Sequence, residues 1–192
     1  TALVLACFDG AHWHLRPFFW TPAEGLEDRA KRDRARYDVW VSQGFIKTTP
    51  GRSIDYEFVA RDFMEIVDGM NLVAVGFDRW RIDVIQKEFD RLGVRLPLVP
   101  FGQGFKDMSP ALDLFETALL NGQVKHGAHP VLTMCAANVT VERDAADNRK
   151  FTKAKSNGRI DGMVAAAMAY GMHAKALEQT EHEAAIYDLN NA

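Results

Sequence analysis

The chain has 192 residues, of which 47% are hydrophobic and 26% charged, and its net charge is −3. This length fits one domain with short appendages, and the composition is that of an ordinary globular protein. No apolar run reaches the roughly 18 residues that a membrane-spanning helix needs, and the negative net charge excludes a protein that binds nucleic acid through its overall charge, so any basic site must be local.

The first half of the chain predicts a hairpin followed by helices. Asp9 and Gly10 form a tight-turn signal between two strand-like runs. Thr21 and Pro22 suit an N-cap and a first helical position, so they predict the start of a charged helix. In chain order we expect strands over 1–7 and 12–20, a helix over 21–40, a strand over 44–48 and a helix over 53–67.

The second half predicts alternating strands and helices. The run from Leu72 to Phe77 is short, apolar and rich in valine, which indicates a buried strand. A helical pattern follows it and ends at Gly93, and a further strand comes next, which predicts a parallel strand–helix–strand unit. The expected ranges are strands over 72–77, 96–101 and 139–142, helices over 81–92, 109–121, 130–138 and 160–176, and a basic loop over 143–159.

Two carboxylates stand out as candidates for metal binding. Asp78 ends the strand over 72–77, and ligands of open α/β sheets bind beyond the carboxyl ends of the strands. A half-buried carboxylate there needs a partner such as a cation. Asp161 lies in the first turn of the last helix, where its plainer role would be to complement the helix dipole. Convergent carboxylates suit a pair of Mg²⁺ or Mn²⁺ ions, which can stabilise the attacking and leaving oxygens of a phosphodiester.

The basic segment before Asp161 is a candidate for DNA contact. Residues 143–159 contain six Lys or Arg residues and two Asp residues. Such a segment can hold a phosphate backbone without reading its sequence, or it can be a solvated loop, and both interpretations stay open. The candidate DNA-binding residues are Arg149, Lys150, Lys153, Lys155 and Arg159.

Several runs of the chain together resemble one known family. They are FGQGFKDMSP over 101–110, the pair Asn138 and Val139, and the stretch over 147–169 with its Gly-Arg-Ile-Asp-Gly core; a series between Tyr37 and Tyr56 is also similar. Over about residues 1–176 the sequence resembles the C-terminal nuclease domain of the large terminase subunit of tailed bacteriophages.

The resemblance implies an α/β, ribonuclease H-like fold, in which helices flank a mixed sheet, and a two-metal endonuclease that cuts concatemeric viral DNA. By position, Asp78 matches the family's second acidic ligand and Asp161 its last one. The family's first acidic ligand lies on the central strand, before the position of Thr1. We therefore expect this sequence to be a piece of a longer chain, and we expect the piece to lack that strand. We expect the nuclease domain to cover 1–178 and a polar tail to cover 179–192.

The resemblance also implies partners: double-stranded DNA, an upstream ATPase domain of the same polypeptide, and the portal and small terminase subunit, all in the cytoplasm of a phage-infected or prophage-bearing bacterium. An alternative is a DNA- or portal-docking module on a nuclease-like scaffold, inactive as this fragment. A different ribonuclease H-like enzyme, such as a resolvase or transposase, would carry the same carboxylates, but the Gly-Gln-Gly-Phe to Met-Ser-Pro stretch argues against it.

Overall fold

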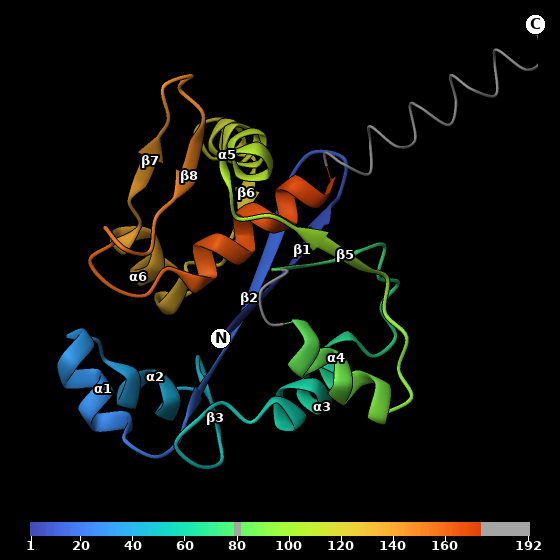
Figure 1. Ribbon diagram of the computed structural model, residues 1–192, viewed down its shortest axis with the longest axis vertical. Coiled ribbons are helices and arrows are strands. Elements are labelled where there is room, and N and C mark those ends of the chain that lie inside the picture. Colours follow the sequence, from blue (N-terminus) through green and yellow to red (C-terminus); the bar gives the residue numbers. More distant parts are fainter. Residues whose placement is uncertain (79–81, 174–192) are drawn as a thin grey trace, which may run out of the picture.

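A computed structural model describes residues 1–78 and 82–173, which form a mixed α/β fold (Figure 1). The strands are β1 (Ala2–Phe8), β2 (Trp13–Pro22), β3 (Lys47–Thr49), β4 (Val75–Asp78), β5 (Leu98–Phe101), β6 (Val124–Lys125), β7 (Val141–Arg143) and β8 (Arg149–Phe151). The helices are α1 (Leu26–Asp33), α2 (Tyr37–Ser42), α3 (Tyr56–Val67), α4 (Ile82–Arg91), α5 (Phe105–Leu120), α6 (Pro130–Asn138) and a helix over 161–173, drawn in red in Figure 1.

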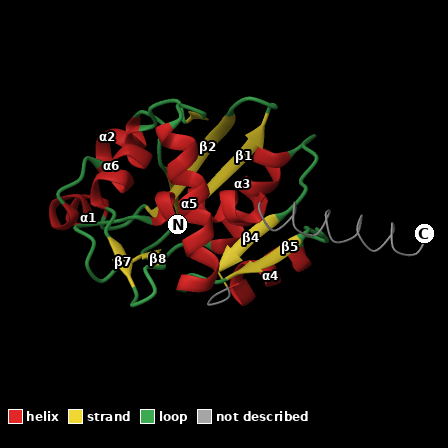
Figure 2. Ribbon diagram, turned by 90° about the horizontal axis from the view of Figure 1, so that it is seen from above, coloured by secondary structure: helices red, strands yellow, loops and turns green. Residues whose placement is uncertain are grey.

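The described strands form three separate hydrogen-bonded sheets. β1 and β2 are an antiparallel hairpin, and β2 pairs in parallel with both β3 and β6. β4 and β5 form a parallel pair, and β7 and β8 an antiparallel one. In Figure 2, β2, β1, β4 and β5 follow one another across the molecule, yet among the described residues no ladder of hydrogen bonds joins β1 to β4.

Successive side chains of β1 face two different hydrophobic cores. Val4 belongs to the larger core, which α5, α6 and the 161–173 helix share with β2. Leu3 and Leu5 pack instead against the smaller core, which is built mainly by α3 and α4. Because neighbouring side chains of a strand point to opposite faces, β1 separates two layers of helices. The 161–173 helix is therefore a core helix, buried against one face of the strands.

Two glycines let the 161–173 helix lie directly against β4 and β5. A Cβ atom at Gly171 would come within 2.5 Å of the Phe101 ring, and one at Gly76 within 2.8 Å of Met172 Cγ. Contacts this short force atoms to move, so a side chain at either position would overpack the core. Phe101 is the register partner of Asp78. This packing therefore fixes the end of β4 against the helix that begins at Asp161.

Much of the expected element order is confirmed. The unit over 72–101 is β4, α4 and β5, and its two strands are parallel. The helix expected over 130–138 is α6, with those bounds. No helix in the described part of the chain is long and apolar enough to cross a membrane. The tail expected over 179–192 lies outside the described residues.

Several expectations are wrong. Thr21 and Pro22 do not start a helix: they end β2, because they pair with Thr48 and Thr49 beside them, and strand pairing overrides a local capping signal. The charged helix expected up to residue 40 is divided into α1 and α2. The segment over 143–159 is not a loop throughout, since it contains β8, which pairs with β7 and packs on α5.

Candidate active site

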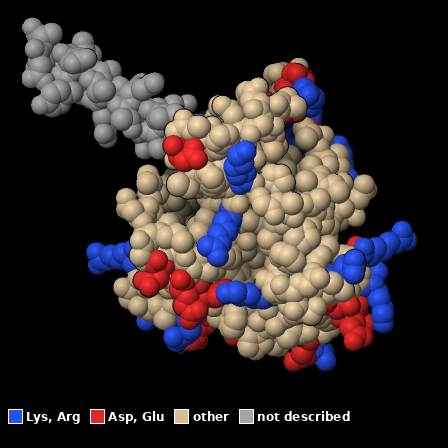
Figure 3. Space-filling view, turned by 180° about the vertical axis from the view of Figure 1, so that it is seen from behind, with Lys and Arg blue, Asp and Glu red and all other residues tan. Residues whose placement is uncertain are grey.

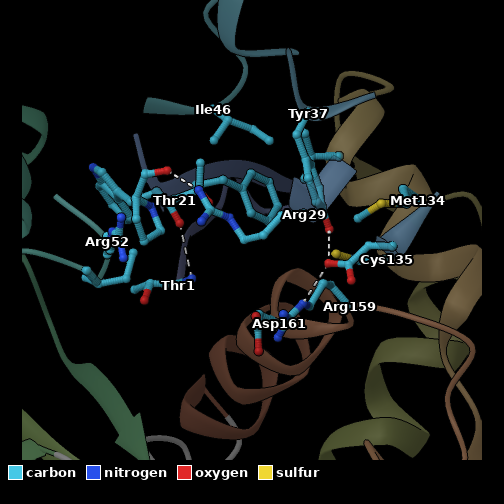
Figure 4. Close-up of a pocket in the computed structure, with 16 residues that line it drawn as sticks. Thr1, Thr21, Arg29, Tyr37, Ile46, Arg52, Met134, Cys135, Arg159 and Asp161 are labelled. Atoms are coloured by element: carbon cyan, nitrogen blue, oxygen red, sulfur yellow. Dashed lines mark hydrogen bonds and ion pairs between the residues drawn. The ribbon is translucent and has the colours of Figure 1, made fainter. Parts of the chain in front are cut away.

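Asp161 is the first residue of the 161–173 helix and lines a cavity of about 300 Å³ (Figure 4). The rest of the cavity wall comes from Thr1 and the end of β2, from α1, α2 and α6, from the loops on either side of β3, and from the turn before Asp161. The Asp161 side chain is 40% exposed, and its Oδ1 atom lies 3.7 Å from Lys153 Nζ. The carboxylate is therefore open to solvent and has a cationic neighbour.

Asp78 ends β4, as predicted, and a glutamine side chain holds its carboxylate. Gln103 Nε2 donates a hydrogen bond of 2.7 Å to Asp78 Oδ2. Gln103 lies between β5 and α5, in a loop tied to α5 by a 3.1 Å bond from the Gly102 N–H to Asp107 Oδ2. Our sequence reasoning missed Gln103. The available signal was its place directly after β5, because the carboxyl ends of neighbouring parallel strands meet at the same sheet edge.

The two predicted ligands lie near different parts of the 161–173 helix and have different polar neighbours. Asp78 is level with Phe101, whose ring packs at Gly171. Asp161 is about ten residues earlier on that helix, a rise of roughly 15 Å. Among the residues that the structure describes, no three His, Cys, Asp or Glu side chains are grouped to hold a metal ion. The described residues thus supply two carboxylates, and a complete centre needs further ligands.

The turn that leads into Asp161 is held from two distant parts of the chain. The Arg159 guanidinium donates through Nε to Asp33 Oδ2 of α1, at 3.2 Å. The Arg159 carbonyl oxygen accepts a 3.3 Å bond from Asn138 Nδ2 at the end of α6. A Cβ atom at Gly158 would come within 2.7 Å of the same amide nitrogen. The position of Asp161 therefore depends on α1 and α6 together.

Asp33 is a hub of hydrogen bonds at the cavity wall. Its carboxylate accepts from Arg32 Nε at 2.8 Å, from Arg159 Nε at 3.2 Å and from the Tyr37 hydroxyl at 3.1 Å. Burial alone would raise the pKa of Asp33, but the three hydrogen bonds outweigh it and hold this pKa below its ordinary value of 3.8. Burial of Tyr37, and then the charge of Asp33 beside it, raise the pKa of Tyr37 to about 12.

The raised pKa of Tyr37 predicts a loss of stability in alkali. Neutral Tyr37 stabilises the fold fully below pH 10, the ordinary tyrosine pKa, and this contribution is lost as pH rises from 10 toward 12. The loss amounts to at most about 3 kcal/mol, at 1.36 kcal/mol per pKa unit. The Tyr37→Phe variant has no phenol proton to lose. At pH 9 its free energy of unfolding should be lower by about 1 kcal/mol, because the hydrogen bond is lost. Above pH 10 its stability should depend less on pH than that of the original chain. Urea midpoints at pH 9 and pH 11 measure both effects, and an equal pH dependence in both proteins would contradict the prediction.

Each of the five predicted DNA-binding cations has a carboxylate neighbour. Arg149 is the most firmly held: its side chain is 16% exposed and pairs with Asp113 and Glu116 of α5. Lys150 lies 4.5 Å above the ring of Phe105 as well as near an acidic group. The other pairs are Lys150 and Lys155 with Glu142, Lys153 with Asp161, and Arg159 with Asp33. A DNA phosphate would therefore have to replace carboxylates at all five positions.

The surface charge is similarly mixed elsewhere. On the face shown in Figure 3, Lys and Arg side chains are dispersed, several of them beside Asp or Glu, and they form no continuous basic surface. The net charge of −3 agrees with this view. A polyanion must therefore be recognised at a limited number of local cationic positions.

Comparison with known proteins shows two close likenesses. The chain is 58% identical over 172 residues to the "Terminase, large subunit" of Enterobacteria phage HK97. The aligned region covers 89% of this chain and 34% of that protein. It matches the crystal structure of the HK97 bacteriophage large terminase with a TM-score of 0.86 and 57% identity, over 90% of this chain and 36% of that one.

A more distant relative and a family match agree with these likenesses. "Protein YmfN" of Escherichia coli strain K12 is 26% identical over 178 residues, which cover 83% of this chain and 36% of that protein. The chain thus spans about a third of the length of the curated relatives that it matches. Residues 1–178 match the family described as terminase large subunit, endonuclease domain. The chain therefore belongs to the endonuclease-domain family of terminase large subunits.

Proposed function

We propose that the chain is a divalent-metal-dependent DNA endonuclease domain, which hydrolyses phosphodiesters of concatemeric double-stranded DNA during viral genome packaging. The observation that carries the proposal is the placement of Asp161. Its exposed carboxylate begins a core helix, lines a cavity of about 300 Å³ and lies beside Lys153, in a chain of this family. A carboxylate that only complements a helix dipole needs neither the cavity nor the cation.

Asp78 and Asp161 would each contribute a carboxylate to Mg²⁺ or Mn²⁺, and we expect two ions. Since a rise of roughly 15 Å separates the two positions along the 161–173 helix, the carboxylates must come closer together when the ions bind. Carboxylate oxygens are the hard ligands that both ions prefer, and the hydrogen bond from Gln103 orients the carboxylate of Asp78. Bound there, the metal ions would polarise the phosphoryl oxygen and activate the attacking water. Lys153 lies 3.7 Å from Asp161 Oδ1, so it can hold a phosphate oxygen next to that ligand.

The other predicted cations would hold the DNA backbone on either side of the cut. Arg149, Lys150, Lys155 and Arg159 lie on β8 or between it and Asp161. Each would exchange its carboxylate partners for a phosphate. Arg149 would give up two of them, Asp113 and Glu116, and Arg159 would give up its contact with Asp33. Such contacts position the duplex without reading its sequence, so we propose cleavage with little sequence preference from these residues.

The sheet supports a ribonuclease H-like fold. β1 has β2 as its described neighbour and β4 has β5, and the facing edges of β1 and β4 carry no described ladder. A strand between them would join both pairs into one mixed sheet, in which β1 would be antiparallel to it and β4 parallel. The family resemblance assigns the first acidic ligand to that central strand, upstream of Thr1.

The whole protein would combine this domain with further parts. We place the nuclease domain at 1–178 and a polar tail at 179–192, after an ATPase domain of the same polypeptide. Its partners would be double-stranded DNA, the portal and the small terminase subunit, in the cytoplasm of a phage-infected or prophage-bearing bacterium. The relatives' greater length leaves room for such a domain.

Nicking of supercoiled plasmid by the purified chain tests the proposal. We expect nicking with Mn²⁺ or Mg²⁺ and none in EDTA, because the carboxylates alone cannot stabilise the developing negative charge. The second candidate function, a docking module, is favoured by the absence of a three-ligand metal cluster among the described residues. Folded protein that binds duplex DNA equally with metal and with EDTA, and does not nick it in either, would support the docking module.

A further inference from the structure

A compact group of cations lies where α1 meets α2, apart from the five predicted DNA-binding residues. Lys31, Arg32, Arg34 and Arg36 are all exposed and occupy four of six consecutive positions. Arg32 pairs with Asp33. Over residues 1–78 and 82–173, Lys31, Arg34 and Arg36 have no carboxylate within ion-pair distance. These three, which we call the α1–α2 cations, are therefore available to an anion from outside.

The α1–α2 cations stand beside the candidate active site. Asp33, at the centre of the group, binds the Arg159 guanidinium at 3.2 Å, and Arg159 precedes Asp161 by two residues. Asp33 and Tyr37 line the same cavity as Asp161. In Figure 4 the Tyr37 side chain points toward Arg159, and the Tyr37 hydroxyl and the Arg159 guanidinium both bind Asp33 Oδ2. In both Figure 1 and Figure 2, α1, α2 and α6 lie on the left side of the molecule.

The backbone of one of the three, Arg34, has an unfavourable conformation. Arg34 ends α1 with φ of 48° and ψ of 44°, in the left-handed region. Glycine or asparagine is the usual residue at such a position, and other residues cost roughly 1–2 kcal/mol there. The turn directs the chain from α1 into α2 within three residues. A long cation at this position costs stability, and contact with an anion would offset that cost.

We propose that the α1–α2 cations bind the phosphate backbone of duplex DNA and hold it against the cavity that contains Asp161. The inference rests on the proposed nuclease function and adds a site to it. Each strand of a duplex carries one phosphate per roughly 3.4 Å of helix axis, so cations at positions 31, 34 and 36 can meet neighbouring phosphates of the same duplex. Unlike the cations of the 143–159 segment, these three need not release a carboxylate first, so they contribute more to the affinity.

The test compares two triple variants that remove equal charge. The first is Lys31→Gln/Arg34→Asn/Arg36→Gln, with asparagine at 34 because it tolerates the left-handed conformation. The control is Lys87→Gln/Arg95→Gln/Lys125→Gln, three exposed cations that also make no ion pair in the described part of the chain. Both variants change the net charge from −3 to −6. Binding of a fluorescent duplex of arbitrary sequence is measured in EDTA over a series of NaCl concentrations, after a thermal melt has shown that each variant folds.

We expect the first variant to bind at least about tenfold more weakly at low salt, and its plot of log K against log[NaCl] to be shallower by about 2–3, since each lost phosphate contact removes about 0.9. The control should keep the slope of the original chain. Equal weakening in both variants would overturn the inference, because overall charge would explain it. So would unchanged binding by the first variant.

Plasmid nicking separates failure of this inference from failure of the proposed function. If the original chain nicks with metal and the first variant binds and nicks equally well, the nuclease proposal is retained and the proposed DNA contact of the α1–α2 cations is rejected. If the original chain neither binds duplex DNA nor nicks it, both proposals fail together.

Discussion

Asp161→Asn is expected to reduce metal-dependent plasmid nicking by at least about a hundredfold, more than the 10–100-fold that loss of an outer-shell partner costs a metal site. The substitution keeps the size of the side chain but removes the negative charge that a hard divalent cation requires. The fold should persist, because the Asp161 side chain is 40% exposed and asparagine forfeits only about 0.3–1 kcal/mol of helix-dipole stabilisation. Binding of duplex DNA in EDTA should be unchanged or slightly stronger.

Asp83→Asn is the matched control for that experiment. Asp83 also lies in the first turn of a helix, α4, and is exposed. It shares the dipole role of Asp161, but in the part of the chain that the structure describes it lines no such cavity and has no lysine partner. Nicking by Asp83→Asn should equal that of the original chain, whereas Asp78→Asn should be impaired like Asp161→Asn. If Asp161→Asn kept more than a tenth of the activity while folding normally, the carboxylate would serve the helix alone, and the proposed ligand set would be wrong.

Asp62→Ala should have the largest effect on stability, a loss of about 2–4 kcal/mol in the free energy of unfolding. Asp62 is buried on α3, where Oδ2 accepts a 2.7 Å bond from Trp20 Nε1 of β2 and Oδ1 pairs with Lys47 of β3. Removing the carboxylate leaves the buried indole N–H without an acceptor, which alone costs about 1–3 kcal/mol. Lys47 is half exposed and can regain water, so it adds less. Urea unfolding measures the difference.

Glu57→Ala on the same helix provides the comparison. Glu57 pairs with Arg61 at 3.0 Å on the exposed side of α3, and exposed pairs contribute about 0–1 kcal/mol. The double variant Trp20→Phe/Asp62→Leu replaces donor and acceptor together. Its loss in the free energy of unfolding should be smaller than the sum of the losses of Trp20→Phe and Asp62→Leu, because no buried donor then remains without an acceptor. An additive double variant would show that Trp20 and Asp62 do not depend on each other.

Local patterns predicted those parts of the fold that depend on short segments. The valine-rich run before Asp78 and the helix stop at Gly93 sufficed for the parallel β4–α4–β5 unit. The errors occurred where distant partners decide the structure. Thr21 has the local signal of a helix cap, but it pairs with Thr48 of β3 and so belongs to a strand. β6 is only two residues long and exists because it pairs with β2. Charge along 143–159 concealed β8, whose Arg149 is neutralised by α5 rather than by solvent.

The candidate site shows the same division. Asp78 and Asp161 could be named from their positions after a strand and at the start of a helix, and the structure places both in those positions. The contacts of Asp33 with Arg159 and of Asn138 with Arg159 could not be named, because the paired residues are 126 and 21 positions apart. No periodicity or motif spans such separations. The α1–α2 cations were visible in the sequence, but only their lack of ion partners over residues 1–78 and 82–173 distinguishes them from an ordinary solvated face.

The two bonds to Arg159 have a consequence for the newly synthesised protein. Chains emerge from the ribosome with their N-terminal parts first, so α1 and α6 are present before the turn that they hold. Asp161 can be set in place only after nearly the whole domain has been made and the contact between residues 33 and 159 has closed. On the proposed function, an incomplete nascent chain would therefore have no cutting activity, and DNA near the ribosome would be exposed only to the finished nuclease.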